Sequence, residues 1–444
     1  VNRIQNLRDT IWSKHKFCRT MSSATRGLTD PDLLSFTFPC WVMPTDYERM
    51  VRYSRENDIQ TWIAKPRSLG AGMGIYIVNS FDDLERERSS SNVVQTYLEL
   101  PHLIEKPGLD GTTNKFKWDM RSYVLVTSVT PLRAYVYSRG LVRISTSPYT
   151  KDCKANITAC LTNTSLNKKV EGAQLKDITW SFKKLKEYIA GQGESNWDDV
   201  FLRIQRAIGL ALLSSESELL KHFTPKGFRC DSCYQLLGVD LLFDANLQPK
   251  VVEINGEPNL KLTSNGKTHY DFTKRNMARD LTALVYNQES EAPRTAEKLV
   301  RWANAVLSDG KGGRGAVQLG EDHLRYVLDT MREHAKQGAF RPVYPNEKLA
   351  GTYGRYLRFL RDKEAAKPDG DLAVHADGRR YRLHQVITVL QNDDALAKVT
   401  VRGGDGGGGS GSSSGGDDGE SNTSGSGVGG SLGAASNSAA APLR

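Results

Sequence analysis

The sequence lacks any apolar run long enough to span a membrane, and Asn2 to Lys16 are polar and charged, so we expect neither membrane contact nor a secretory leader. No aromatic–basic module typical of nucleic-acid-binding proteins is visible. The net charge of +9 favours an acidic partner. The six cysteines show no disulfide framework, which predicts reduced thiols in a reducing compartment. A lone CxxC pair, Cys230 and Cys233, lacks the further ligands that a zinc site needs.

Four regions differ in composition or pattern. Residues 1–45 look irregular, and residues 46–290 alternate between β-type runs and helical patterns. Residues 291–401 carry helical patterns without visible chemistry. Residues 402–444 are rich in Gly and Ser and contain no aromatic residue, which predicts a disordered tail because such a segment cannot bury a core.

The most informative segment, Leu236 to Asn259, reads as two apolar strands around a turn. If the turn centres on Asn246 and Leu247, Asp240 faces Glu253, and Asn255 shares the face of Glu253 because side chains alternate along a strand. Two such carboxylates repel each other unless a cation lies between them, and hard oxygen ligands suit Mg²⁺ bridged to phosphate. The segment therefore predicts a magnesium–nucleotide site, against the alternative of an exposed hairpin edge with scattered acids.

A glycine-rich turn follows the strand that ends at Lys65, with glycines at positions 70, 72 and 74. Glycines let backbone N–H groups approach phosphate oxygens, and Lys65 adds a charge. A strand follows the turn, so it is neither a dinucleotide-binding turn nor a Walker loop. The pattern predicts a hairpin that folds over a triphosphate, although ordinary turn chemistry is the alternative.

A basic strand carries Lys117, Asp119 and Arg121 on one face, and Arg143 lies inside the apolar run LVRIS. A half-buried Arg requires an anionic partner. Internal pairing of Asp119 with Lys117 or Arg121 is one interpretation. The other is that Arg121 and Arg143 hold an acidic substrate or the charge of a transferred phosphoryl group.

Together these motifs resemble the tubulin–tyrosine ligase-like family, which has an ATP-grasp fold. The matching stretches cover roughly residues 35–287 in the family's order: TWIAKP with GAGMGIYIV, VVQTYLELPHLI, KWDMRSYVLVTSVTPLRAYVYSRGLVRIS, LTNTSLNKK and GVDLLFDANLQPKVVEINGEPNL. The implied fold class is α+β, with antiparallel sheets flanked by helices.

The resemblance implies five segments: residues 1–45 as the remnant of an N-terminal domain, 46–105 and 106–290 as the central and C-terminal ATP-grasp subdomains, 291–401 as a helical extension and 402–444 as the tail.

The resemblance also implies roles for individual residues. ATP would be held by Lys65, Gly72, Met73, Gly74, Gln95, Tyr97, Leu98, Lys117 and Asp119, with the strand Gln95–Leu98 beside adenine. Arg121, Arg143, Thr162 and Asn163 would act on the acidic substrate and the γ-phosphate region, and Asp240, Glu253 and Asn255 would hold Mg²⁺, with Glu253 also counted as catalytic.

The implied activity is ATP-dependent addition of glutamate to glutamate side chains of tubulin C-terminal tails through an acyl phosphate. Tubulin glycylation and an inactive tubulin-binding pseudo-ligase are the alternatives. The implied partners are tubulin or microtubules and free glutamate, without nucleic acid or membrane. We expect a monomer in the cytoplasm, on the cytoskeleton, with the cilium or basal body as a further expected location.

Two residues depart from the family pattern. Cys160 precedes Leu-Thr-Asn where the family usually has His, and Asn259 follows Pro258 where the family often has Ser. A cysteine cannot reproduce the two hydrogen bonds of an imidazole, so the sequence predicts intact ATP binding but leaves the transfer specificity open.

Overall fold

The structure is a computed structural model, and it describes residues 4, 10–70, 72–129, 131–153, 155–193, 195–216, 218–219, 233–286, 326, 329–330 and 332–365. These residues belong to one unit that spans residues 1–393. The predicted tail, Cys230 and most of the predicted helical extension lie outside the described residues. None of the helices in the described part is long and apolar enough to cross a membrane.

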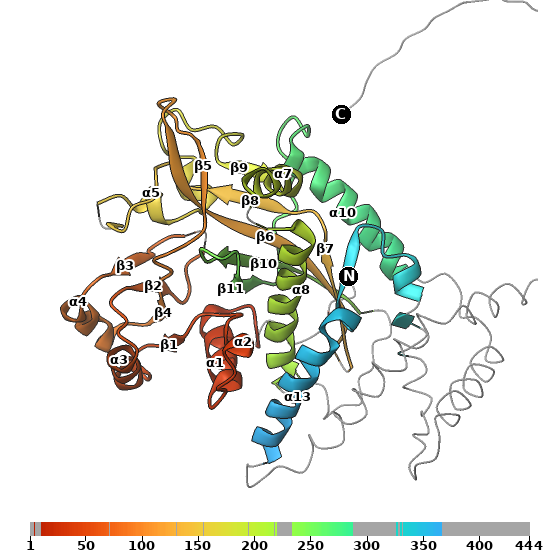
Figure 1. The fold of residues 1–444 in the computed structure, drawn as a ribbon, viewed down its shortest axis with the longest axis horizontal. Coiled ribbons are helices and arrows are strands. Elements are labelled where there is room, and N and C mark those ends of the chain that lie inside the picture. Colours follow the sequence, from red (N-terminus) through yellow and green to blue (C-terminus); the bar gives the residue numbers. More distant parts are fainter. Residues whose placement is uncertain are drawn as a thin grey trace, which may run out of the picture. The chain divides into compact units, whose positions relative to one another are not determined.

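A small antiparallel sheet forms the first part of the fold (Figure 1). Its strands are β1 (Cys40–Val42), β2 (Trp62–Pro66), β3 (Tyr76–Val78) and β4 (Asn92–Thr96), in the order β1-β4-β2-β3. Trp62 and Ala64 of β2 pack in a core with α3 (Tyr47–Glu56) and α4 (Phe81–Glu85). Because side chains alternate, Ile63 and Lys65 point to the other face of this sheet.

The large sheet is organised around β6 (Thr113–Val129), which is long enough to pair with four neighbours at different points along its length. The main order is β11-β10-β6-β7-β12, and β5, β8 and β9 complete the eight strands. Their bounds are β5 (Leu103–Pro107), β7 (Leu132–Tyr137), β8 (Leu141–Ile144), β9 (Thr179–Ser181), β10 (Gln235–Phe243), β11 (Pro249–Asn255) and β12 (Phe340–Tyr344).

Helices cover both faces of the large sheet (Figure 1). The helix α8 (Trp197–Ser214) packs on the face that carries Trp118 and Met120, together with α1 (Lys14–Thr25) and α13 (Ala350–Ala365). The helix α10 (His269–Val285) packs on the opposite face, against Tyr123 and Leu125. The shorter helices are α2 (Pro31–Leu34), α5 (Ile157–Cys160), α6 (Thr164–Asn167) and α7 (Phe182–Gln192), with the 3₁₀ turns η2 (Arg86–Ser89) and η4 (Glu347–Leu349).

The architecture confirms the predicted α+β class, and two local expectations were wrong. Residues 1–45 contain α1, α2 and β1 rather than irregular chain. The region expected to be a helical extension contributes the strand β12, which pairs with β7 at the edge of the large sheet.

The expectation of reduced thiols was also wrong, because all five cysteines in the described part of the chain, Cys18, Cys40, Cys153, Cys160 and Cys233, are disulfide-bonded. Cys18 is linked to Cys40 and Cys153 is linked to Cys160 by disulfides. The first disulfide joins α1 to β1 of the small sheet. The second closes a short loop that ends at α5, beside the Leu-Thr-Asn segment. Neither pairing could be predicted from the spacing of the cysteines along the chain.

Candidate functional site

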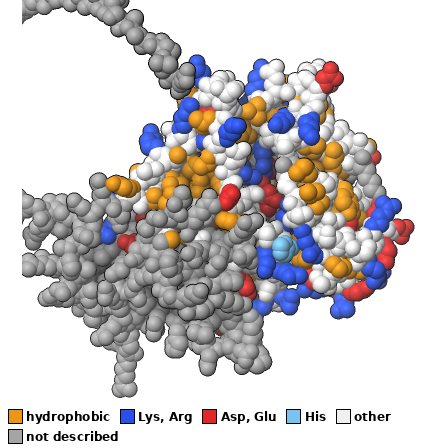
Figure 2. Space-filling model, turned by 180° about the vertical axis from the view of Figure 1, so that it is seen from behind, with side chains coloured by type: hydrophobic (Ala, Val, Ile, Leu, Met, Phe, Trp, Pro, Cys, Tyr) orange, Lys and Arg blue, Asp and Glu red, His pale blue; other side chains and the backbone are white. Residues whose placement is uncertain are grey.

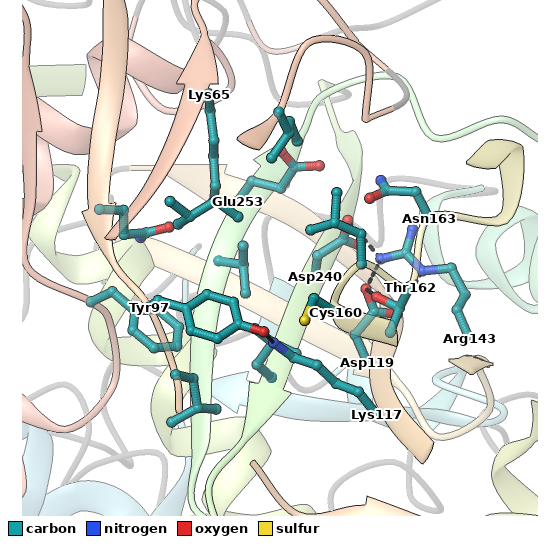
Figure 3. A pocket seen from close by; sticks show the side chains of 18 of the residues that line it. Lys65, Tyr97, Lys117, Asp119, Arg143, Cys160, Thr162, Asn163, Asp240 and Glu253 are labelled. Carbon is teal, nitrogen blue, oxygen red and sulfur yellow. Dashed lines mark hydrogen bonds and ion pairs between the residues drawn. The ribbon is translucent and has the colours of Figure 1, made fainter. Parts of the chain in front are cut away.

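A pocket lies between the small sheet and the large sheet, and charged side chains from both sheets point into it (Figure 3). On the opposite view of the molecule, basic and acidic side chains lie together in a hollow between two parts that carry apolar patches (Figure 2). The pocket is lined by Phe38, Ile63, Lys65, Ile75, Gln95, Thr96, Tyr97, Leu98, Lys117, Asp119, Arg143, Cys160, Leu161, Thr162, Asn163, Asp240, Leu242, Val252 and Glu253.

Strand register places one row of charges across the large sheet. Arg143 of β8 lies opposite Asp119 of β6, Arg121 of β6 lies opposite Asp240 of β10, and Asp240 lies opposite Glu253 of β11. Opposite residues in antiparallel strands share a face, so all five side chains belong to the same face of the sheet. The row therefore alternates between cation and acid across four neighbouring strands and ends in two adjacent carboxylates.

A β-bulge brings Asp240 opposite Glu253. Near the turn, Phe243 pairs with Pro249 and Leu241 pairs with Val251, and the register shifts between Leu241 and Asp240. The extra residue in β11 moves Glu253 into the position opposite Asp240. The predicted pairing is confirmed, but its cause is the bulge and not the centre of the turn.

Two arginines neutralise the acids of this row. Arg143 donates bidentately to Asp119 with both N···O distances at 2.6 Å, and its Nη2 lies 2.9 Å from Asp240 Oδ2. Arg121 Nε and Nη2 also bond Asp240, with Nη2 at 2.8 Å from Oδ2. Burial alone would raise the pKa of Asp240, but the charges of Arg121 and Arg143 outweigh it and hold that pKa well below its usual range.

The pairing settles which partner Asp119 has. Its carboxylate pairs with Arg143 rather than with Lys117 or Arg121, and it also accepts a bond from Thr162 Oγ1 at 2.8 Å. Arg121 pairs with Asp240 instead. Internal ion pairing is therefore present, but between different partners from those expected, and it lies in the wall of a pocket.

Two buried lysines face the row from the sides of the pocket. Lys65 Nζ donates to Gln95 Oε1 at 2.6 Å, and Lys117 Nζ donates to Tyr97 Oη at 2.7 Å. Neither bond supplies a carboxylate. Burial lowers the pKa of Lys65 to about 8 and that of Lys117 to about 7. Among the described residues, neither ammonium group has a direct acidic partner, which makes this pocket receptive to an anion.

The glycine-rich turn reaches the pocket through Asn163. Gly72 has a φ of +80°, and a Cβ built there would lie 2.9 Å from Asn163 Cγ, so no side chain fits without displacing Asn163. Gly74 also has a positive φ, +67°. The side chain of Met73 is 57% exposed. The turn is thus held close to the Leu-Thr-Asn segment without lining the pocket itself.

We expect Gly72→Ala to lower the free energy of unfolding by about 1–2 kcal/mol, because the left-handed backbone conformation is costly for a residue with a Cβ and because Asn163 must move. Urea unfolding would measure the change. Gly70→Ala is the matched control, because its φ is unremarkable and nothing lies within 4 Å of its Cβ position. Equal stability of the two variants would contradict the assigned contact with Asn163.

Most of the predicted site residues meet in the pocket, but five of them do not line it: Arg121, Asn255, Gly72, Met73 and Gly74. Arg121 and Asn255 lie behind the lining, where Arg121 bonds Asp240 and Asn255 Nδ2 donates to Glu253 Oε1 at 3.2 Å. The residues that the sequence reasoning missed are mostly apolar: Phe38, Ile63, Ile75, Thr96, Leu161, Leu242 and Val252. Alternation along β2 could have found Ile63, which shares the face of Lys65.

The predicted metal ligands are compatible with a hard cation. Asp240 and Glu253 are cross-strand neighbours, and Asn255 lies next to Glu253. Among the described residues, no group of three His, Cys, Asp or Glu side chains could hold a metal ion. Any metal here would therefore rely on two carboxylates, an amide and outside oxygens. That donor set suits Mg²⁺, which keeps waters and shares phosphate oxygens instead of requiring a full protein cage.

The two antiparallel sheets with a charged pocket between them are consistent with the ATP-grasp class of fold. The sequence profile described as the tubulin–tyrosine ligase family matches residues 2–292, and the chain belongs to this family. That match begins well before residue 35, where the resemblance seemed to start.

Curated relatives agree with this assignment. The chain is similar to tubulin monoglutamylase TTLL4 of Mus musculus, with 32% identity over 56% of this chain and 20% of the relative. It is also similar to tubulin polyglutamylase TTLL6 of Homo sapiens, with 31% identity over 73% of this chain and 36% of the relative. It is similar as well to tubulin polyglutamylase ttll6 of Danio rerio, with 28% identity over 69% of this chain and 39% of the relative. The chain thus spans a fifth to two fifths of the length of these relatives.

Proposed function

We propose that this protein is an ATP-dependent ligase that joins the amino group of free glutamate to glutamate side chains in the acidic C-terminal tails of tubulin. The observation that carries the proposal is the row of Arg143, Asp119, Arg121, Asp240 and Glu253 across one sheet face, with two buried lysines beside it. The names of the relatives support tubulin as the substrate. The net charge of +9 suits an acidic peptide.

In this proposal the small sheet binds the nucleotide. Lys65 and Lys117 would contact the phosphates beneath the turn of Gly72 to Gly74, and the strand end at Gln95, Tyr97 and Leu98 would lie beside adenine. An anion would supply both lysines with the partner that the free pocket lacks. Bound Mg²⁺, held by Asp240, Glu253 and Asn255, would neutralise phosphate charge and align the terminal phosphate.

The large sheet would then hold the reacting carboxylate. Arg121 and Arg143 would orient the tubulin glutamate and the γ-phosphoryl group, while Thr162 and Asn163 position Asp119 and the turn above. The carboxylate attacks the γ-phosphorus, ADP leaves and an acyl phosphate forms. The amine of free glutamate then displaces phosphate to form an amide. Positioning and charge neutralisation account for most of such catalysis.

The direct test is incorporation of labelled glutamate into brain microtubules with ATP and Mg²⁺, with labelled glycine and tyrosine in parallel. We expect glutamate incorporation that requires ATP. Incorporation of glycine instead would identify a glycylase with the same chemistry. Nucleotide binding without incorporation of any of the three would contradict the proposal.

A second candidate is a pseudo-ligase that binds tubulin without transfer. One observation favours it: Cys160, which stands where the family usually has His, forms a disulfide with Cys153. The carboxylates expected to hold the metal are nevertheless all present. The incorporation experiment separates the two candidates.

The domain organisation and location follow the same reasoning. We propose that residues 46–105 and 106–290 are the two ATP-grasp subdomains and that the protein acts as a monomer on cytoplasmic microtubules. Co-sedimentation with microtubules, with and without their acidic tails, would test the partner. Binding that is unaffected by tail removal would contradict it.

We expect ATP affinity to fall as the pH rises above about 7. In the free pocket the pKa is about 7 for Lys117 and about 8 for Lys65. Bound phosphates favour the ammonium forms and raise both pKa values, so binding above these pH values takes up protons. Calorimetry at about pH 8 in two buffers of different ionisation enthalpy should show proton uptake, and Kd should rise by up to about tenfold per pH unit for each lysine. A Kd that does not change over this range would contradict the assigned role of the lysines.

A further inference from the structure

The Cys153–Cys160 disulfide is buried where the two sheets meet. Cys153 is 1% exposed and Cys160 is 2% exposed. They share a core cluster with Ile77 of β3, and Ile63 of β2 packs against it. The disulfide therefore fixes a loop that follows the large sheet against the pocket side of the small sheet.

One end of the disulfide, Cys160, lies at the charged pocket (Figure 3), and the other end contacts a residue of its lining, Tyr97. Cys160 lines the pocket directly. Cys153 Sγ lies 3.5 Å from Tyr97 Oη, and this oxygen accepts the hydrogen bond of Lys117. On the other side, Thr162 follows Cys160 by two residues and donates to Asp119. The disulfide thus lies between the Tyr97 hydroxyl, which accepts the hydrogen bond of Lys117, and the Thr162 hydroxyl, which donates to Asp119.

We propose that the Cys153–Cys160 disulfide is a positioning element of the nucleotide pocket, so that nucleotide affinity depends on its oxidation state. The inference rests on the proposed function, because it concerns the same pocket. With the disulfide closed, the loop holds Tyr97 against Lys117 and Thr162 against Asp119. When the disulfide is open, the covalent link is lost and only non-covalent contacts fix the loop, so the lysine and the carboxylate lose part of their alignment.

The chemistry of opening is ordinary thiol–disulfide exchange with a dithiol reductant. One thiolate of dithiothreitol attacks a protein sulfur, the protein S–S bond breaks and a mixed disulfide forms. The second dithiothreitol thiolate displaces the remaining protein thiolate. The products are two cysteine thiols and cyclic oxidised dithiothreitol, so the protein gains two electrons and two protons. Because both cysteines are buried, we expect a bound nucleotide to slow this reduction.

The test compares oxidised protein, dithiothreitol-reduced protein and the variant C153S/C160S. Binding of a fluorescent ATP analogue with Mg²⁺ gives Kd, and steady-state transfer gives KM for ATP and kcat. We expect Kd and KM to rise about tenfold on reduction and in C153S/C160S, with a smaller change in kcat. Circular dichroism confirms that each sample is folded, and mass spectrometry of the non-reduced digest identifies the Cys153–Cys160 peptide.

The Cys18–Cys40 disulfide provides a matched control. Cys18 and Cys40 are absent from the described pocket lining, so C18S/C40S should bind nucleotide as the oxidised wild type does and should still respond to dithiothreitol. C153S/C160S should no longer respond. Equal Kd values for folded oxidised and folded reduced protein would overturn the inference, as would free thiols at Cys153 and Cys160 in air-oxidised protein. Failure of the proposed function looks different, because then neither redox state transfers glutamate, whereas this inference is decided by the ratio of the two Kd values.

Discussion

Glu253→Gln is expected to reduce glutamate transfer by at least about 10²-fold while the protein stays folded. The substitution removes a negative charge from the pair of carboxylates at the end of the charged row but preserves the shape of the side chain. The amide oxygen of Gln can still accept the bond from Asn255 Nδ2. We therefore expect loss of the metal-dependent step without loss of the hairpin.

Transfer assays and thermal unfolding, carried out in parallel, would measure these two effects. Glu257→Gln is the matched control, since it makes the same chemical change on an exposed side chain two residues after the end of β11. Raising the Mg²⁺ concentration should partly restore Kd for nucleotide in Glu253→Gln and leave Glu257→Gln unchanged. Transfer at the normal rate by Glu253→Gln would show that the metal assignment is wrong.

Arg143→Ala should destabilise the protein by about 3–5 kcal/mol and abolish transfer. The arginine is the only cation within salt-bridge distance of Asp119 among the described residues, and it shares Asp240 with Arg121. Its removal leaves Asp119 charged in a largely buried position. Arg143→Lys should recover part of the stability but little activity, because one ammonium group cannot reproduce the bidentate bond to Asp119.

Urea unfolding would measure the stability of these variants. Arg139→Ala is the control, because it removes an exposed arginine at the preceding turn and so shows the effect of losing a positive charge without losing the ion pairs.

The pH dependence of stability gives a second check. The lowered pKa of Asp240 contributes stability above its unfolded pKa, and this contribution is lost as the pH falls. Arg143→Ala should therefore show a weaker decline in stability on acidification than the wild type. An unchanged acid profile would contradict the assigned pairing.

The hairpin of Asp240 and Glu253 was the part of the site that the sequence predicted best. Polar residues inside apolar runs are rare enough to identify a site, and strand alternation assigns their faces. The same rule placed Lys117, Asp119 and Arg121 on one side of β6. Alternation is a local property, so it can be read without knowing which strands are neighbours.

Which side chains pair across neighbouring strands could not be predicted from alternation along a single strand. That Asp119 meets Arg143 depends on β8 pairing with β6, and this register is set by the whole sheet. The same holds for the bond between Lys117 and Tyr97, which joins residues of different sheets, and for the link between Cys153 and Cys160. The resemblance to the family supplied the roles of Gln95, Tyr97 and Leu98, for which the residues themselves carry no signal.

The strand β12 has a consequence for how the protein is produced. The family match ends at residue 292, so a recombinant chain cut there would lose β12, which covers the outer edge of β7. It would also lose Glu333, whose carboxylate lies 2.7 Å from the buried Arg133. An uncovered strand edge invites intermolecular pairing, and an unpaired buried cation weakens the fold beside it. Such a truncated chain should aggregate, whereas one that continues through α13 keeps β7 paired with β12 and Arg133 paired with Glu333.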